Sequence, residues 1–69
     1  MEHLQTVETE RVLSLREVEA LIGLRKTAIY GAIKTDCFPP PLKLTARKSG
    51  WLVSEVHAWL DRKRQERDQ

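Results

Sequence analysis

The strongest constraint on the fold of this 69-residue chain is a glycine, Gly23, that lies between two short amphipathic segments. A residue just past a helix C-terminus often needs a positive φ, which glycine adopts without steric cost. Only Leu24 and Arg25 then separate the first segment from the second. Two amphipathic helices joined by such a tight turn make a helix-turn-helix, so the sequence predicts this motif.

The first segment, "LSLREVEALIG", carries a complete helix-start signature. Ser14 suits the N-cap position, and Glu17 three residues later completes a capping box. Leu13 precedes the cap, where it is expected to pack on Val18. The apolar stripe of this helix consists of Leu15, Val18, Leu21 and Ile22.

The second segment predicts a helix with one apolar and one exposed side. The apolar side carries Ile29, Ala32 and Ile33. The other side carries Thr27, Tyr30, Gly31 and Lys34. We expect Asp36 to take the left-handed conformation at the end of this helix, because the run "FPPP" after Cys37 cannot continue it.

The segment "PLKLTARKSGWLV" predicts a β-hairpin. It reads as a strand, a basic loop that includes Ser49 and Gly50, and a second strand that begins at Trp51. Pro41 suits only the start or the edge of such a strand. A β-hairpin that follows a helix-turn-helix is a wing.

A third helix is expected after the hairpin, with Ser54 as its N-cap and Glu55 in its first turn. Val56, Trp59 and Leu60 form its apolar stripe. The charged stretch "DRKRQERDQ" that follows is expected to be a solvated helix end that frays.

Together these segments predict a mainly α-helical fold with a small β-hairpin, a winged helix-turn-helix of three helices plus a wing. A chain of 69 residues is near the lower limit for one small domain, so one core must suffice. We expect Phe38, Trp51 and Trp59 to belong to that core, with Cys37 as a small packing residue beside them. The predicted organisation is a flexible arm over residues 1–10, the winged domain over 11–67 and a frayed tail at 68–69.

Composition excludes several classes of function. The chain is too short for a deep cleft with a catalytic apparatus, so an enzyme is not expected. The residues His3, Cys37 and His57 lack the short paired spacing of a zinc site, so neither a metal nor a cofactor is expected. A single cysteine, no long apolar run and no secretory signal favour a cytoplasmic protein without a membrane segment.

The placement of charge points to a polyanionic partner more clearly than the total of +2 does. Between Arg25 and Trp51 the chain has six basic residues and one acid, Asp36, which is a local net charge of +5. DNA recognition needs cations for phosphates and side chains that reach base edges. The candidate DNA-contacting residues are Arg25, Lys26, Thr27, Tyr30, Gly31, Lys34, Lys43, Thr45, Arg47 and Lys48. A basic surface that only contacts solvent is the alternative.

Two of these candidates have two interpretations each. Tyr30 either contacts a phosphate or a sugar, or shields the core as a half-buried rim residue. Gly31 lies mid-helix, where glycine costs about 0.5–1 kcal/mol relative to alanine. Its absent side chain either lets the helix approach DNA closely, or reflects a lost base contact in a protein that relies on cooperating copies or on DNA shape.

Four pieces in order, "LSLREVEALIGL", "TAIY", "FPPPLKL" and "GWLVSEVHAWL", resemble the AlpA family of small phage-type regulators. This family is similar in architecture to the MerR-like winged-helix excisionases. The resemblance extends from Val12 to about Arg67. It implies a winged helix-turn-helix whose second helix enters the major groove of DNA, with the wing beside it. It also implies a regulator of an integrase gene, an excision factor that acts with an integrase, or both.

The sequence departs from this family pattern at three positions. Serine or threonine is usual where Arg25 stands, commonly as an N-cap, so the start of the second helix should be weaker by about 1 kcal/mol unless Thr27 or water serves its amides. A basic residue is frequent where Gly31 stands. A glycine is common at the position of Asp36.

The leading functional hypothesis is a sequence-specific double-stranded DNA-binding protein of a prophage or integrative element, active at the nucleoid. Its partners would be DNA, an integrase or further copies of itself, with no small-molecule substrate. The alternative is the same fold used as a protein-interaction module that contacts an integrase, polymerase or repressor with little DNA binding. We expect a monomer in solution that cooperates on DNA.

Overall fold

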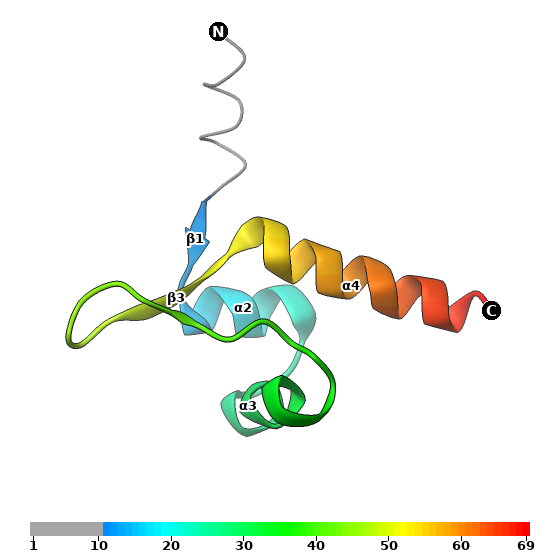
Figure 1. Ribbon diagram of the computed structural model, residues 1–69, viewed down its shortest axis with the longest axis horizontal. Coiled ribbons are helices and arrows are strands. Elements are labelled where there is room, and N and C mark those ends of the chain that lie inside the picture. Colours follow the sequence, from blue (N-terminus) through cyan, green and yellow to red (C-terminus); the bar gives the residue numbers. More distant parts are fainter. Residues whose placement is uncertain (1–10) are drawn as a thin grey trace, which may run out of the picture.

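The structure, a computed structural model, describes residues 11–69, and the predicted arm over residues 1–10 lies outside the described residues. The described elements are β1 (Val12–Leu13), α2 (Leu15–Ile22), α3 (Lys26–Thr35), β2 (Leu42–Lys43), β3 (Ser49–Leu52) and α4 (Val53–Arg67). The predicted winged helix-turn-helix is confirmed: α2 and α3 form the motif, and the hairpin of β2 and β3 projects from the helices as the wing (Figure 1).

Helix α2 begins and ends as predicted. The Glu17 backbone N–H donates to Ser14 Oγ at 3.1 Å, and the Ser14 backbone N–H donates to Glu17 Oε1 at 2.8 Å, which completes the capping box. The bond from the Ser14 backbone lowers the pKa of Glu17, because it stabilises the carboxylate. Gly23 ends the helix with a φ of 76°, and its N–H donates to the Glu19 carbonyl.

The end of α3 differs from the expectation for Asp36. Asp36 has a φ of −136° and still donates its N–H to the Ala32 carbonyl, so it remains tied to the helix. The left-handed residue is Cys37, with a φ of 59°. The chain therefore reverses one residue later than predicted, and the Phe38 backbone N–H donates a hydrogen bond to the Ala32 carbonyl at 3.1 Å. The packing role predicted for Cys37 is wrong, because its side chain is exposed, whereas the neighbouring Phe38 is buried as predicted.

The sheet has a third strand that the sequence did not indicate, in the order β1-β3-β2 with antiparallel pairing throughout. Ser49 and Gly50 lie within β3, and not in the loop as expected, because they pair with Lys43 and Leu42 of β2. A Cβ atom at Gly50 would lie 2.5 Å from a methyl carbon of Val12 and 3.0 Å from the Leu13 carbonyl oxygen. Glycine therefore allows β1 to approach β3 closely.

Helix α4 follows β3 without a connecting loop. The predicted N-cap at Ser54 is wrong, because the helix begins at Val53 and the N-cap residue is Leu52. The Val53 N–H donates to the Arg11 carbonyl at 2.9 Å, so strand pairing with the β1 segment sets the start of the helix. The charged residues after Leu60, which were expected to fray, remain helical as far as Arg67. No helix within residues 11–69 is long and apolar enough to cross a bilayer.

The predicted aromatic core is confirmed. The buried residues are Leu13, Val18, Ile29, Phe38, Trp51, Val56 and Trp59. The rings of Phe38 and Trp59 meet edge to face, with centroids 4.9 Å apart. Both indole N–H groups are satisfied, since Trp51 donates to the Pro39 carbonyl and Trp59 donates to the Asp36 carbonyl. One core thus joins the helix-turn-helix, the sheet and α4.

Candidate nucleic-acid interface

The exposed face of α3 brings together five of the ten predicted contact residues. A shallow hollow on this face is lined by Lys26, Thr27, Tyr30, Gly31 and Lys34. On the opposite side of the helix, Ile29 is fully buried, and Ala32 and Ile33 pack on the core. Helix α3 therefore presents two lysines, a threonine, a tyrosine and a glycine outward, while its other side is fixed in the core.

Tyr30 links the α3 face to the wing strands. Its ring meets the Trp51 ring of β3 edge to face, with centroids 6.2 Å apart, while 38% of the residue stays exposed. The interpretation as a half-buried rim residue is confirmed by this contact. Contact with a phosphate or sugar remains a prediction.

Gly31 has no packing reason to be a glycine. Beyond its chain neighbours and the backbone of its own helix, a Cβ atom at this position would meet no atom within 4 Å, and Gly31 is not among the residues with positive φ. Its carbonyl accepts a hydrogen bond from the Thr35 hydroxyl at 3.0 Å. The protein's own structure therefore tolerates a side chain in the middle of this face.

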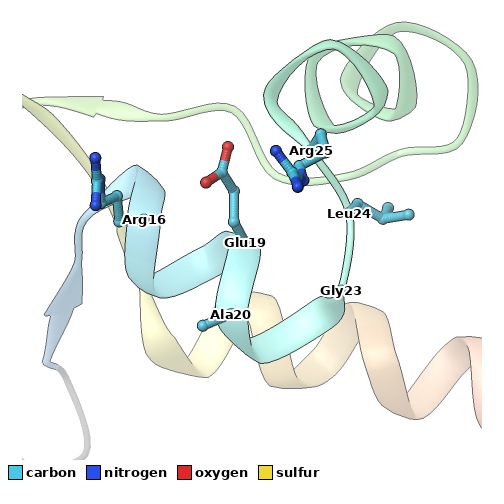
Figure 2. A pocket seen from close by; sticks show the side chains of 6 residues that line it. All are labelled: Arg16, Glu19, Ala20, Gly23, Leu24 and Arg25. Atoms are coloured by element: carbon cyan, nitrogen blue, oxygen red, sulfur yellow. The ribbon is translucent and has the colours of Figure 1, made fainter.

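The start of α3 is open on the side of the helix-turn-helix turn. Arg25 is the N-cap residue and makes no capping side-chain hydrogen bond. The backbone N–H groups of the first turn therefore lack a side-chain acceptor from the N-cap, an arrangement that favours an anion. A second hollow lies beside this helix end (Figure 2), lined by Arg16, Glu19, Ala20, Gly23, Leu24 and Arg25.

Arg16 is a residue of this site that sequence reasoning missed. It lies on α2, and Figure 2 shows Glu19 between Arg16 and Arg25. Arg16 precedes the basic segment between Arg25 and Trp51, and it is followed directly by the acid Glu17. The available signal was its place on α2 away from the apolar stripe, one residue before the capping-box glutamate.

The remaining predicted residues belong to the wing. Lys43 lies in β2 opposite Ser49, and Thr45, Arg47 and Lys48 lie in the exposed turn. The Thr45 hydroxyl oxygen accepts the backbone N–H groups of Arg47 and Lys48 at 3.2 and 3.1 Å. Thr45 therefore shapes the turn that presents the two cations.

Comparison with known proteins identifies the family. The family described as prophage CP4-57 regulatory protein (AlpA) matches residues 11–64. The chain belongs to the AlpA family of phage regulatory proteins. The AlpA match covers the helix-turn-helix, the wing and most of α4, and it confirms the resemblance seen in the four sequence pieces.

One relative is the uncharacterized protein ORF88 of Enterobacteria phage P4, which is 40% identical over 57 residues. The aligned region covers 83% of this chain but only 65% of the relative, so the chain spans just under two thirds of that protein's length. No solved structure matches the chain.

In this AlpA family member, α3 begins without a side-chain cap, since its N-cap residue is Arg25 and not the serine or threonine that the resemblance leads us to expect. Within residues 11–69, no group of three or more histidine, cysteine or acidic residues could hold a metal ion, and His3 lies outside the described residues.

Proposed function

We propose that this protein binds double-stranded DNA and regulates transcription of a phage or integrated element in the cytoplasm, at the nucleoid. One observation carries the proposal: the exposed face of α3 and the wing are both basic, and the single acid among them, Asp36, is ion-paired with Lys63. A cationic surface on a helix-turn-helix and its wing matches the charge of the DNA backbone. Membership of a phage regulatory family supports the same conclusion.

The proposed binding mode places α3 in the major groove. Thr27 and Lys34 reach base edges from the exposed face, with Gly31 between them. Arg25, Lys26 and the open N–H groups of the first turn bind phosphate. Arg16 adds a phosphate contact from α2, and the wing cations Lys43, Arg47 and Lys48 follow the adjacent backbone.

The first experiment is a fluorescence titration of the purified protein against random duplex DNA and against the DNA that flanks its own gene and any neighbouring integrase gene. We expect tighter binding to the flanking DNA, with a logarithmic affinity that falls linearly as the logarithm of salt rises. Equal affinity for both DNAs, together with no dependence on salt, would exclude a DNA-binding regulator.

The excision role with an integrase is a finer part of the proposal. An excision factor would occupy several adjacent sites cooperatively and bend them, whereas a transcriptional activator needs only one site. Gel-mobility bending assays on the flanking DNA separate the two, because only the excision role requires a multi-protein bent complex.

A specific observation favours protein contact as the second candidate function. Val12, Leu42 and Leu44 are 41%, 41% and 48% exposed. Leu42 pairs with Gly50, so the two residues share a face of the sheet. A Cβ atom at Gly50 would meet the side chains of Val12 and Leu44, so Val12, Leu42 and Leu44 lie on that same face. Trp51 and Leu13 occupy the opposite, buried face. The exposed apolar face fits an integrase, a polymerase or another copy on DNA, and salt-independent behaviour in the titration would favour this use alone.

Replacing Gly31 with alanine tests the two interpretations of this position. Because a Cβ there meets no other atom, we expect Gly31→Ala to raise the free energy of unfolding by about 0.5–1 kcal/mol. Urea unfolding measures this. If glycine permits close approach, Gly31→Ala should weaken binding to the flanking DNA. If a base contact was lost, Gly31→Ala should bind unchanged or tighter, and Gly31→Arg should gain affinity.

A further inference from the structure

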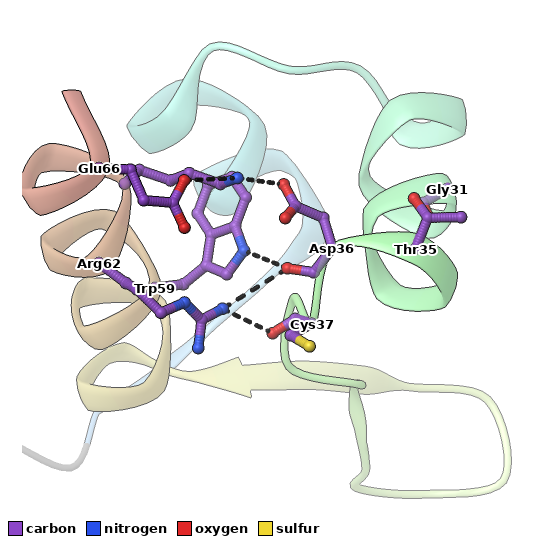
Figure 3. A network of polar contacts seen from close by, with 8 residues as sticks. Gly31, Thr35, Asp36, Cys37, Trp59, Arg62 and Glu66 are labelled. Atoms are coloured by element: carbon purple, nitrogen blue, oxygen red, sulfur yellow. Dashed lines mark hydrogen bonds and ion pairs between the residues drawn. The ribbon is translucent and has the colours of Figure 1, made fainter. Parts of the chain in front are cut away.

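The C-terminal end of α3 is fastened to α4 by a network of polar contacts (Figure 3). The Trp59 indole N–H donates to the Asp36 carbonyl at 3.0 Å. Arg62 Nη2 donates to the same carbonyl at 3.5 Å and to the Cys37 carbonyl at 3.3 Å. Lys63 Nζ forms an ion pair with the Asp36 carboxylate. Three residues of α4 and the two residues that directly follow α3 thus meet at the point where the chain leaves α3.

Arg62 contacts two carbonyl groups at the end of α3, that of the C-cap residue Asp36 and that of Cys37 just beyond it. The last carbonyls of a helix have no intrahelical donor, and they carry the partial negative charge of the helix dipole. The left-handed turn at Cys37 directs the chain away at this point. Arg62 therefore supplies both a donor and a positive charge to the end of α3, from a different helix.

Lys63 acts on the acid beside the proposed DNA face. Asp36 is the only acid between Arg25 and Trp51. Its carboxylate raises the pKa of Lys63 through their hydrogen bond, because it stabilises the ammonium form. The same ammonium lies 5.4 Å from the centroid of the Trp59 ring, which adds a cation–π contact. An unpaired carboxylate at this position would repel DNA phosphates, and the ion pair offsets that charge. Lys63 Nζ also contacts Glu66 Oε1 on its own helix, at 3.4 Å.

We propose that Arg62 and Lys63 are positioning residues for DNA binding, which act through α3 and do not contact DNA themselves. Arg62 holds the end of α3 in place, and Lys63 neutralises Asp36. This proposal rests on the proposed DNA-binding function. By charge alone, Arg62 and Lys63 would be counted among the DNA-contacting cations, but in this proposal they act on the end of α3 and not on DNA.

A double-substitution experiment tests the role of Lys63. The variants are Lys63→Met, Asp36→Asn and the two together, and the readouts are the Kd for flanking DNA and its salt slope. We expect Lys63→Met to weaken binding about three- to tenfold, because it leaves an unpaired acid near DNA. The double variant should return to within about twofold of the wild type, with the salt slope unchanged in all three.

Arg64→Met is the matched control, since Arg64 is an exposed cation on the same helix whose ion pair is with Asp61. It should change the Kd by less than about twofold. If the double variant stays as weak as Lys63→Met and the salt slope falls by about one, Lys63 contacts phosphate directly and the inference is wrong. If Lys63 only stabilised the fold, Lys63→Met would lower the midpoint of unfolding, and the double variant would not recover affinity for DNA. That result would also overturn the inference.

Arg62→Gln gives an independent test. We expect it to reduce affinity for flanking DNA more than for random DNA, because a misplaced α3 loses base contacts before phosphate contacts. Equal loss on both DNAs would show that Arg62 is itself a phosphate contact. If the wild-type protein binds neither DNA, the proposed function fails together with this inference. If the wild type binds and only the recovery is missing, this inference fails alone.

Discussion

Replacing Trp51 with alanine is expected to remove most or all of the folding stability of this domain. Trp51 is 1% exposed, its indole N–H donates to the Pro39 carbonyl, and its strand pairs with β1 on one side and β2 on the other. Truncation of a buried tryptophan costs about 3–5 kcal/mol, which is as much as a core of this size supplies. Urea unfolding followed by circular dichroism measures the loss.

Two variants serve as controls for the Trp51 prediction. Trp51→Phe keeps an aromatic ring in the core but loses the hydrogen bond to Pro39, so it should cost clearly less than alanine. Leu44→Ala removes an exposed aliphatic side chain and should change stability by at most about 0.5 kcal/mol. A Trp51→Ala protein that unfolds at the wild-type urea concentration would show that the sheet is not part of the cooperative core.

Removing the two cations of the wing turn is expected to weaken DNA binding uniformly. In the double variant Arg47→Ala/Lys48→Ala, we expect the salt slope to fall by about 1.8, on the basis of two lost phosphate contacts, and the affinity to fall roughly tenfold or more. The turn itself should persist, because the Thr45 hydroxyl accepts backbone N–H groups that alanine retains. Titration at four or more salt concentrations gives both quantities.

A substitution on the exposed face of α3 should behave differently from the wing substitutions. Thr27→Ala should weaken binding to the flanking DNA and leave random-DNA binding nearly unchanged, because a base contact carries sequence information and a phosphate contact does not. Arg64→Ala/Arg67→Ala removes the same charge from the far end of α4 and is the charge-matched control. An unchanged salt slope in the wing variant would show that the wing does not touch phosphate.

Sequence reasoning succeeded where a local rule decides the outcome. The capping box of α2 depends on two residues three positions apart, and the turn after it depends on the freedom of one glycine, Gly23. The buried side of α3 follows from helical spacing alone. The family resemblance, confirmed over residues 11–64, used the same local segments in their order.

Several of the errors lie where tertiary contacts or the local turn geometry override a residue's own preference. Ser54 is a good N-cap by type, but the bond from Val53 to the Arg11 carbonyl starts α4 earlier. Ser49 and Gly50 look like loop residues, but strand partners and the close approach of β1 draw them into β3. Asp36 is suited to a left-handed turn, but it stays tied to the helix while Cys37 makes the turn.

The sequence by itself determined the elements of the helix-turn-helix, the aromatic members of the core and the placement of basic charge, because spacing and residue type set these within one turn or one strand. Only the tertiary structure decided which cations are free for a partner. Arg62 and Lys63 look the same in sequence as Arg47 and Lys48, yet they bind the end of α3, while Arg47 and Lys48 lie in an exposed turn. The reason is that the partner of a charged side chain is set by which groups lie near it in space, and Asp36 lies 27 positions before Lys63 in the chain.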